Sequence, residues 1–292
     1  MNTARLTHPP RVGVMLVLPS VLFCTVFVFV PLGVAAFISL TSFPLIGDYE
    51  FVGLENFRLV LNDPVFARSI LYTLLYTAIV TGPILAVGYL LAVLVRSNRQ
   101  GSTLLRTIFF MPFVVGLTTI SFITLLEAQP GSGAINILLR ALGITDGQTA
   151  WLVDGVLATV LVSVLVIWGV SGLTMILLMA AMQGIPKEVY ESAELDGASW
   201  WQAERMVTIP MIRRAIAMSV IVSVIGSFLA FTQFFILTQG GPGSETTTVV
   251  MAIYRRAFVD LQLGAATAMS LILVVLVALV TAFQFWLLRE RD

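Results

Sequence analysis

The sequence is poor in the side chains that bind metals and phosphates. It contains one cysteine (Cys24), one histidine (His8) and one lysine (Lys187). One cysteine cannot form an intrachain disulfide, and one histidine with one cysteine cannot build a His/Cys zinc site. A nucleotide-binding phosphate loop needs the sequence Gly-Lys-Ser/Thr, whereas Lys187 is followed by Glu188. We therefore expect no metal centre, no catalytic site and no nucleotide-binding site on this chain.

Charged side chains are scarce as well. Only 11% of the residues are charged and 58% are hydrophobic, whereas about 25% are charged in ordinary soluble domains. The net charge of zero and the lack of a basic cluster argue against a nucleic-acid partner. All 16 basic and all 16 acidic residues fall outside the long apolar runs or at their ends. Ion-coupled carriers usually keep charged groups within the membrane, so this distribution disfavours such a carrier, and an intramembrane enzyme still more.

What the sequence has in abundance is long apolar runs. A run of 18 or more apolar residues can cross a bilayer as a helix, and lipid offers no hydrogen-bond partners to an irregular chain. We therefore predict an all-α polytopic membrane protein with a single transmembrane domain over residues 12–288. Its six predicted spans are residues 12–40, 70–95, 107–126, 156–181, 214–236 and 264–288.

The basic residues predict the orientation in the membrane, because lysine and arginine are enriched in cytoplasmic loops. Eleven of the 16 fall on the side that holds both chain ends, and five on the other. Residues 1–11 and 289–292 and the loop 182–213 are therefore predicted to be cytoplasmic. The first run is too long for a signal-peptide core and no small-residue cleavage site follows it, so we predict a retained span.

The loop 182–213 concentrates acidic residues between two spans. Five of the 16 acidic residues fall between positions 188 and 204: Glu188, Glu191, Glu194, Asp196 and Glu204. Taken alone, such a charge run is most often a solvated face. Placed in a short cytoplasmic loop, it also indicates a surface presented to a soluble partner.

Local signals predict two short helices in this loop. Pro186 suits the first position of a helix, nothing breaks a helix between 187 and 196, and Gly197 suits the left-handed position after its end. Ser199 and Gln202 have the spacing of a capping box, which predicts a second helix. Pro210 is expected to end or kink that second helix before the fifth span.

Three segments carry a resemblance to a known family. Residues 190–198 and 207–210 read YESAELDGA and VTIP, and they resemble the EAA motif of ABC importer permeases. Residues 237–243 (LTQGGPG) and 51–57 (FVGLENF) resemble two outer loops of the first permease subunit in carbohydrate importers of the maltose and glycerol-3-phosphate type. The chain departs from the motif at Ser192, where alanine is usual, and at Glu204, where an aromatic residue is common.

The resemblance implies a type I ABC importer permease in a bacterial or archaeal plasma membrane. Such a permease pairs with a second, related permease, two ATPase subunits and an extracytoplasmic sugar-binding protein, and it imports a sugar substrate. ATP and magnesium bind to the ATPase, so this chain is expected to bind no cofactor and to be no enzyme. The EAA helix contacts the ATPase, which implies coupling roles for Lys187, Glu191, Ala193, Glu194, Asp196 and Gly197.

The resemblance also indicates where a substrate would pass. Counted back from the two motifs, the maltose-contacting positions of that family fall near Gly169, Val170, Leu173, Ser223 and Ser227. Small and hydroxyl-bearing residues equally line ordinary contacts between membrane helices, so simple packing is an open alternative. The solute also stays open: a glycerol-3-phosphate-type compound is an alternative to a sugar, and an ion-coupled carrier is a less favoured one.

Overall fold

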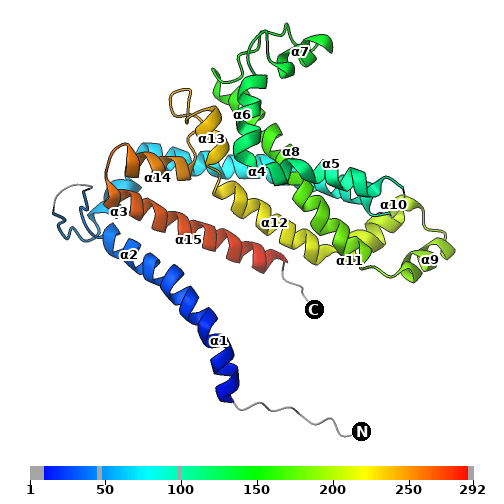
Figure 1. Ribbon diagram of the computed structural model, residues 1–292, viewed down its shortest axis with the longest axis horizontal. Coiled ribbons are helices and arrows are strands. Elements are labelled where there is room, and N and C mark those ends of the chain that lie inside the picture. The colour runs from blue at the N-terminus through cyan, green and yellow to red at the C-terminus, as the bar shows by residue number, and fades with distance from the viewer. Residues whose placement is uncertain (1–9, 45–47, 98–99, 289–292) are drawn as a thin grey trace. The chain divides into compact units, whose positions relative to one another are not determined.

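The computed structural model describes residues 10–44, 48–97 and 100–288, and these are almost entirely helical, which confirms the predicted all-α class (Figure 1). The predicted cytoplasmic ends, 1–11 and 289–292, fall almost wholly outside the described residues. The chain divides into two compact units, Met1–Asp63 with Ile253–Val274 and Pro64–Ala252 with Val275–Asp292. Two of its helices, α14 (Val249–Phe258) and α15 (Leu263–Leu288), run from one unit into the other.

In the first unit, an unbroken helical segment covers the first predicted span. It consists of α1 (Pro10–Cys24), the π-helical turn η1 (Thr25–Phe29) and α2 (Val30–Ser39). The chain then turns into the short helix α3 (Glu55–Leu61). Asn56 holds this turn, because its side-chain amide donates to the carbonyl oxygens of Ser39 and Thr41, both at 2.8 Å.

The second unit is built around one long helix, α8. Its helices are α4 (Pro64–Val95), α5 (Ser102–Val115), α6 (Leu117–Glu127), α7 (Ala134–Ala141), α8 (Gly155–Gln183), α9 (Lys187–Leu195), α10 (Trp200–Ala203), η2 (Glu204–Thr208), α11 (Ile209–Met211), α12 (Arg213–Phe228) and α13 (Thr232–Leu237). Helix α8 packs against α4, α5 and α12. One end of the core gathers around Phe234 and Tyr76, whose rings meet edge to face at 4.9 Å. The other end gathers around Met175, Met179 and Ile212.

The third predicted span is not one continuous helix. Residues 107–126 are divided between α5 and α6, which meet at an angle of 92°. Gly116 lies at the bend with φ +86° and ψ 151°, a backbone conformation that ends a helix and that residues with a side chain rarely adopt. Pro112 lies in the turn before it and cannot donate to the helical hydrogen bonds.

The other predicted spans correspond to helices of similar extent. α4 covers 70–95, α8 covers 156–181, α12 and α13 together cover 214–236, and α15 covers 264–288. By length and composition, the described residues contain five helices that can cross a membrane, or six spans if the bent pair counts as one. The largest difference in a boundary is at α4, which begins at Pro64 and so extends into the predicted outer loop.

Asn136 holds together the loop between α6 and α8. Its side chain is fully buried, and the amide nitrogen lies within 3.2 Å of the carbonyl oxygens of Ala128, Gln129 and Thr149. The amide oxygen accepts a hydrogen bond from the indole nitrogen of Trp151 at 3.2 Å. Asn136, which lies in α7, therefore ties the two sides of this connection together, alongside the backbone hydrogen bond from the Gly131 amide to the Gly147 carbonyl at 2.9 Å.

We expect Asn136→Ala to loosen this loop. Each buried polar group that loses its partner costs about 1–3 kcal/mol, and the substitution removes the partner of several at once. Trypsin cleavage after Arg140, an exposed residue in α7, should accelerate markedly once the loop is loosened. Asn62→Ala is the matched control, because Asn62 is exposed and makes one local bond, to the Arg58 carbonyl. Equal cleavage rates in the two variants would contradict this account of the loop.

Candidate functional site

Helix α9 is short and both of its ends are defined by the backbone. Pro186 takes the position just before the helix, so it lies one residue earlier than predicted. At the other end Gly197 has φ +79°, the left-handed conformation that the sequence predicts. The amide of Gly197 donates to the Glu194 carbonyl at 3.0 Å, and that of Ala198 to the Ala193 carbonyl at 2.9 Å. This pair of bonds is a Schellman motif, and it fixes where α9 stops.

The two faces of α9 differ sharply in character. Val189 and Tyr190 pack against the apolar cluster at the ends of α4, α8 and α12. Ala193 is half-buried on the same side. The opposite face is exposed and acidic, and it carries Glu188, Glu191 and Glu194; Asp196, the residue after the helix, is exposed as well. Lys187 is also exposed, at the first position of the helix. The helix thus presents carboxylates outward while its inner face is anchored.

The second helix of the loop begins as predicted. Ser199 and Gln202 form the capping box, and the Ser199 amide donates to the Gln202 side-chain oxygen at 2.7 Å. From Trp200 the helix continues through the π turn η2 to Met211, so Pro210 lies in its last turn and the break follows at Ile212. In Figure 1, α9 and α10 lie at the far end of α8 from α7.

Glu204 is not part of the exposed acidic face, contrary to the grouping made from the sequence. It is only 4% exposed. One carboxylate oxygen accepts a hydrogen bond from the Tyr89 hydroxyl at 2.7 Å, and the other forms an ion pair with Arg96. A buried carboxylate needs such partners, because an uncompensated charge is costly to remove from water. Glu204 therefore joins the loop to the end of α4.

Arg96 is the functional candidate that sequence reasoning missed. Besides pairing with Glu204, its guanidinium lies 5.8 Å from the centroid of the Tyr190 ring on α9. Its backbone oxygen accepts from the side chain of Gln183, at the end of α8, at 3.2 Å. The signal in the sequence that could have identified Arg96 is its position directly after the second predicted span. Arg96 also lines a cavity of about 510 Å³ with Ser97, Met182, Gln183, Ile185, Lys187 and Tyr190.

The predicted substrate-contacting residues lie on two packed helices, α8 and α12. Gly169 is buried where α8 passes close to α6, and a methyl group there would lie 2.8 Å from the Ile120 side chain. Val170 and Leu173 are half-buried on the same helix. Ser223 and Ser227 are buried on α12 at 6% and 5% exposure. None of the five lines either of the two cavities described here.

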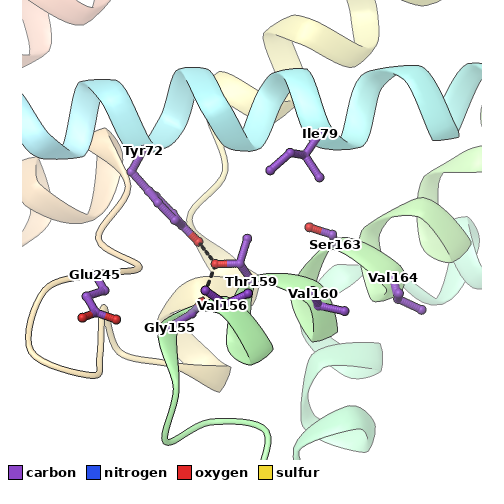
Figure 2. A pocket seen from close by; sticks show the side chains of 9 residues that line it. All are labelled: Tyr72, Ile79, Gly155, Val156, Thr159, Val160, Ser163, Val164 and Glu245. Atoms are coloured by element: carbon purple, nitrogen blue, oxygen red, sulfur yellow. Dashed lines mark hydrogen bonds between the residues drawn. The ribbon is translucent and has the colours of Figure 1, made fainter. Parts of the chain in front are cut away.

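A second cavity lies at the other end of α8. It measures about 490 Å³ and is mostly apolar, with side chains from α4 and α8 and Glu245 from a loop (Figure 2). The hydroxyls of Tyr72 and Thr159 lie 2.9 Å apart, and the Thr159 hydroxyl also donates to the Gly155 carbonyl oxygen at 2.7 Å; both contacts are dashed in Figure 2. The remaining lining residues are Ile79, Gly155, Val156, Val160, Ser163 and Val164.

Comparisons with known proteins agree with the fold and with the family resemblance. The family described as the binding-protein-dependent transport system inner membrane component matches residues 84–291. The multiple sugar-binding transport system permease protein MsmF of Streptococcus mutans is 31% identical, over 95% of this chain and 94% of that protein. The sn-glycerol-3-phosphate transport system permease protein UgpA of Pectobacterium atrosepticum is 32% identical, over 95% and 94%. A chain of a bacterial ABC transporter involved in the import of alginate superposes with a TM-score of 0.83 at 20% identity, over 96% of each chain.

These matches confirm the resemblance to ABC importer permeases, whose permease subunits are not themselves enzymes. The structural match shows that the fold is shared over nearly the whole chain. The chain belongs to the family of inner membrane components of binding-protein-dependent transport systems.

Proposed function

We propose that this chain forms half of the translocation pathway of an ATP-driven importer for a sugar or a sugar derivative. Helix α9 docks on a separate ATPase subunit and is the coupling helix of the importer. The observation that carries the proposal is the construction of α9, in which a fixed, anchored inner face supports an exposed acidic outer face.

The placement of the carboxylates supports a partner for that outer face. Glu194 and Asp196 lie at the carboxyl end of α9, where the helix dipole is negative. Acidic groups there cost the free helix about 0.3–1 kcal/mol each, so they do not serve the helix itself. A basic group on a docking protein compensates them, and Glu191 in the middle of the exposed face is the central contact.

The assembly we propose contains a second, related permease, two ATPases and an extracytoplasmic binding protein. The family is defined by transport systems that depend on a binding protein, which supports that partner. The distribution of basic residues supports a plasma-membrane orientation with both termini in the cytoplasm. Gly169, Val170, Leu173, Ser223 and Ser227 are proposed to contribute this chain's share of the substrate pathway.

A second candidate solute is glycerol-3-phosphate or a similar phosphate ester. The observation in its favour is the 32% identity to a permease named for that transport. A sugar is favoured by the 31% identity to the permease of a multiple sugar-binding system. Family membership favours either over an ion-coupled carrier, which would work without an ATPase.

Affinity purification of the tagged chain tests the proposal. After gentle solubilisation from its own membrane, we expect a second six-span permease and an ATPase with a phosphate loop to co-purify. The binding protein encoded with them can then be titrated with a panel of sugars and with glycerol-3-phosphate. Recovery of this chain alone, from extracts in which other membrane complexes survive, would overturn the proposal.

A further inference from the structure

The end of α4 and the helix α9 are far apart in the sequence but are connected through one small set of polar contacts. Arg96 follows α4 directly and pairs with Glu204, at the start of η2. The Tyr190 hydroxyl on α9 lies 3.0 Å from the Thr208 hydroxyl at the end of η2. The guanidinium of Arg96 lies against the Tyr190 ring. Each of the three elements α4, η2 and α9 is thus joined to the other two.

We propose that the Arg96–Glu204 pair positions α9 on the end of α4, so that a load applied to α9 moves the second span. The inference rests on the proposed function, which makes α9 the contact with the ATPase. Arg96 and Glu204 are positioning residues, since neither lies on the exposed face of α9.

Burial is what makes this pair suitable for the role. Both Glu204 oxygens are engaged, and the side chain of Glu204 is 5% exposed while that of Arg96 is 24% exposed. A buried ion pair is short and directional, and separating it leaves an uncompensated charge in an environment of low polarity. An exposed pair would be screened by water and would give way easily.

The sequence context supports a specific pairing. The EAA motif that this loop resembles commonly has an aromatic residue where this chain has Glu204. An aromatic residue would hold the loop by apolar packing alone. A carboxylate at that position requires a nearby cation, and Arg96 supplies it. The two residues therefore function as a matched pair in this chain.

Spin-label distances measure the positioning directly. In a Cys24→Ser background, Leu94→Cys and Leu195→Cys place labels on the two elements, because Leu94 is 56% and Leu195 89% exposed. We expect a single narrow distance in the complex reconstituted into nanodiscs, unchanged by ATP with magnesium. Arg96→Met, which keeps the apolar stem but removes the charge, should lose the single distance and give a broad distribution. Arg205→Met, on an exposed arginine of η2, should leave the parent distribution unchanged.

A charge exchange separates positioning from a general loss of structure. Arg96→Glu alone should broaden the distance, and Arg96→Glu combined with Glu204→Arg should narrow it again. An unchanged distribution in Arg96→Met, or no recovery in the exchange, would overturn the proposal. The labels report on this chain without reference to its ATPase. If no ATPase co-purifies with this chain, the proposed function is overturned. A broadened distance in Arg96→Met would still support the role of the Arg96–Glu204 pair in that case.

Discussion

Replacing Glu191 with lysine is expected to release the ATPase from this permease and to abolish ATP-driven uptake. Glu191 is exposed in the middle of the acidic face of α9, and its side chain is available to a partner. Breaking a charge pair buried at an interface costs about 2–5 kcal/mol, and each 1.4 kcal/mol is a tenfold change in affinity. Reversal of the charge should therefore lower the affinity for the ATPase by about 30-fold or more. The measurement is the amount of ATPase recovered with the tagged variant.

The substitution should leave the helix itself intact, because lysine and glutamate have similar helix propensities. Glu50→Lys is the matched control. It makes the same change of charge at an exposed residue in the loop 41–69, which is predicted to lie on the opposite side of the membrane. Full recovery of the ATPase and normal uptake by Glu191→Lys would remove α9 from the role of coupling helix.

The parts of this site that sequence predicts well are those determined by local interactions. Gly197 and the Ser199–Gln202 capping box each involve residues only a few positions apart. Their geometry follows from the backbone and from short side chains, so the pattern of residue types is sufficient. The predicted start of α9 differs from the observed start by one residue, because Pro186 fits either the first helical position or the position before it. Differences of this size are usual at helix ends.

Glu204 shows where local reasoning fails. Arg205 directly after it is exposed and charged, and nothing within the loop distinguishes Glu204 from Glu191 or Glu194. Its burial depends on Arg96, which is 108 positions away along the chain. A contact at that separation is visible only after α4 and η2 have been brought together by packing. The one signal in the sequence was that this chain has Glu204 where the motif commonly has an aromatic residue. That signal can be interpreted only once Arg96 is known to be the partner of Glu204.

The bend within the third span could not be predicted from the sequence for a different reason. Hydropathy is an average over a window, and residues on both sides of Gly116 are equally apolar, so the average contains no information on direction. Pro112 and Gly116 were visible in the sequence as helix-weakening residues. Their effect in a membrane depends on neighbouring helices, which either restore a straight helix or stabilise the bend.

Gly172→Val is expected to prevent α5 and α8 from packing and to give little or no folded protein. Gly172 lies in the middle of α8, where the backbone of α5 comes closest. A methyl group there would overlap the carbonyl oxygen of Phe109 and lie 3.0 Å from Phe110 Cα. Both neighbours are backbone atoms, so relief requires moving a whole helix. Overpacking of this kind costs about 3 kcal/mol or more.

Gly226→Val is the matched control for this prediction. Gly226 is also within a membrane helix, α12, but no atom lies within 4 Å of a methyl group placed there. The same two residue types are exchanged, so the difference in helix propensity is equal and only the crowding differs. We expect thermal unfolding of the detergent-solubilised Gly226→Val chain at the temperature of the parent, and aggregation or a large drop in that temperature for Gly172→Val. Equal unfolding temperatures would show that α5 and α8 are not packed as closely as the structure has them, and that the small residue at 172 serves another purpose.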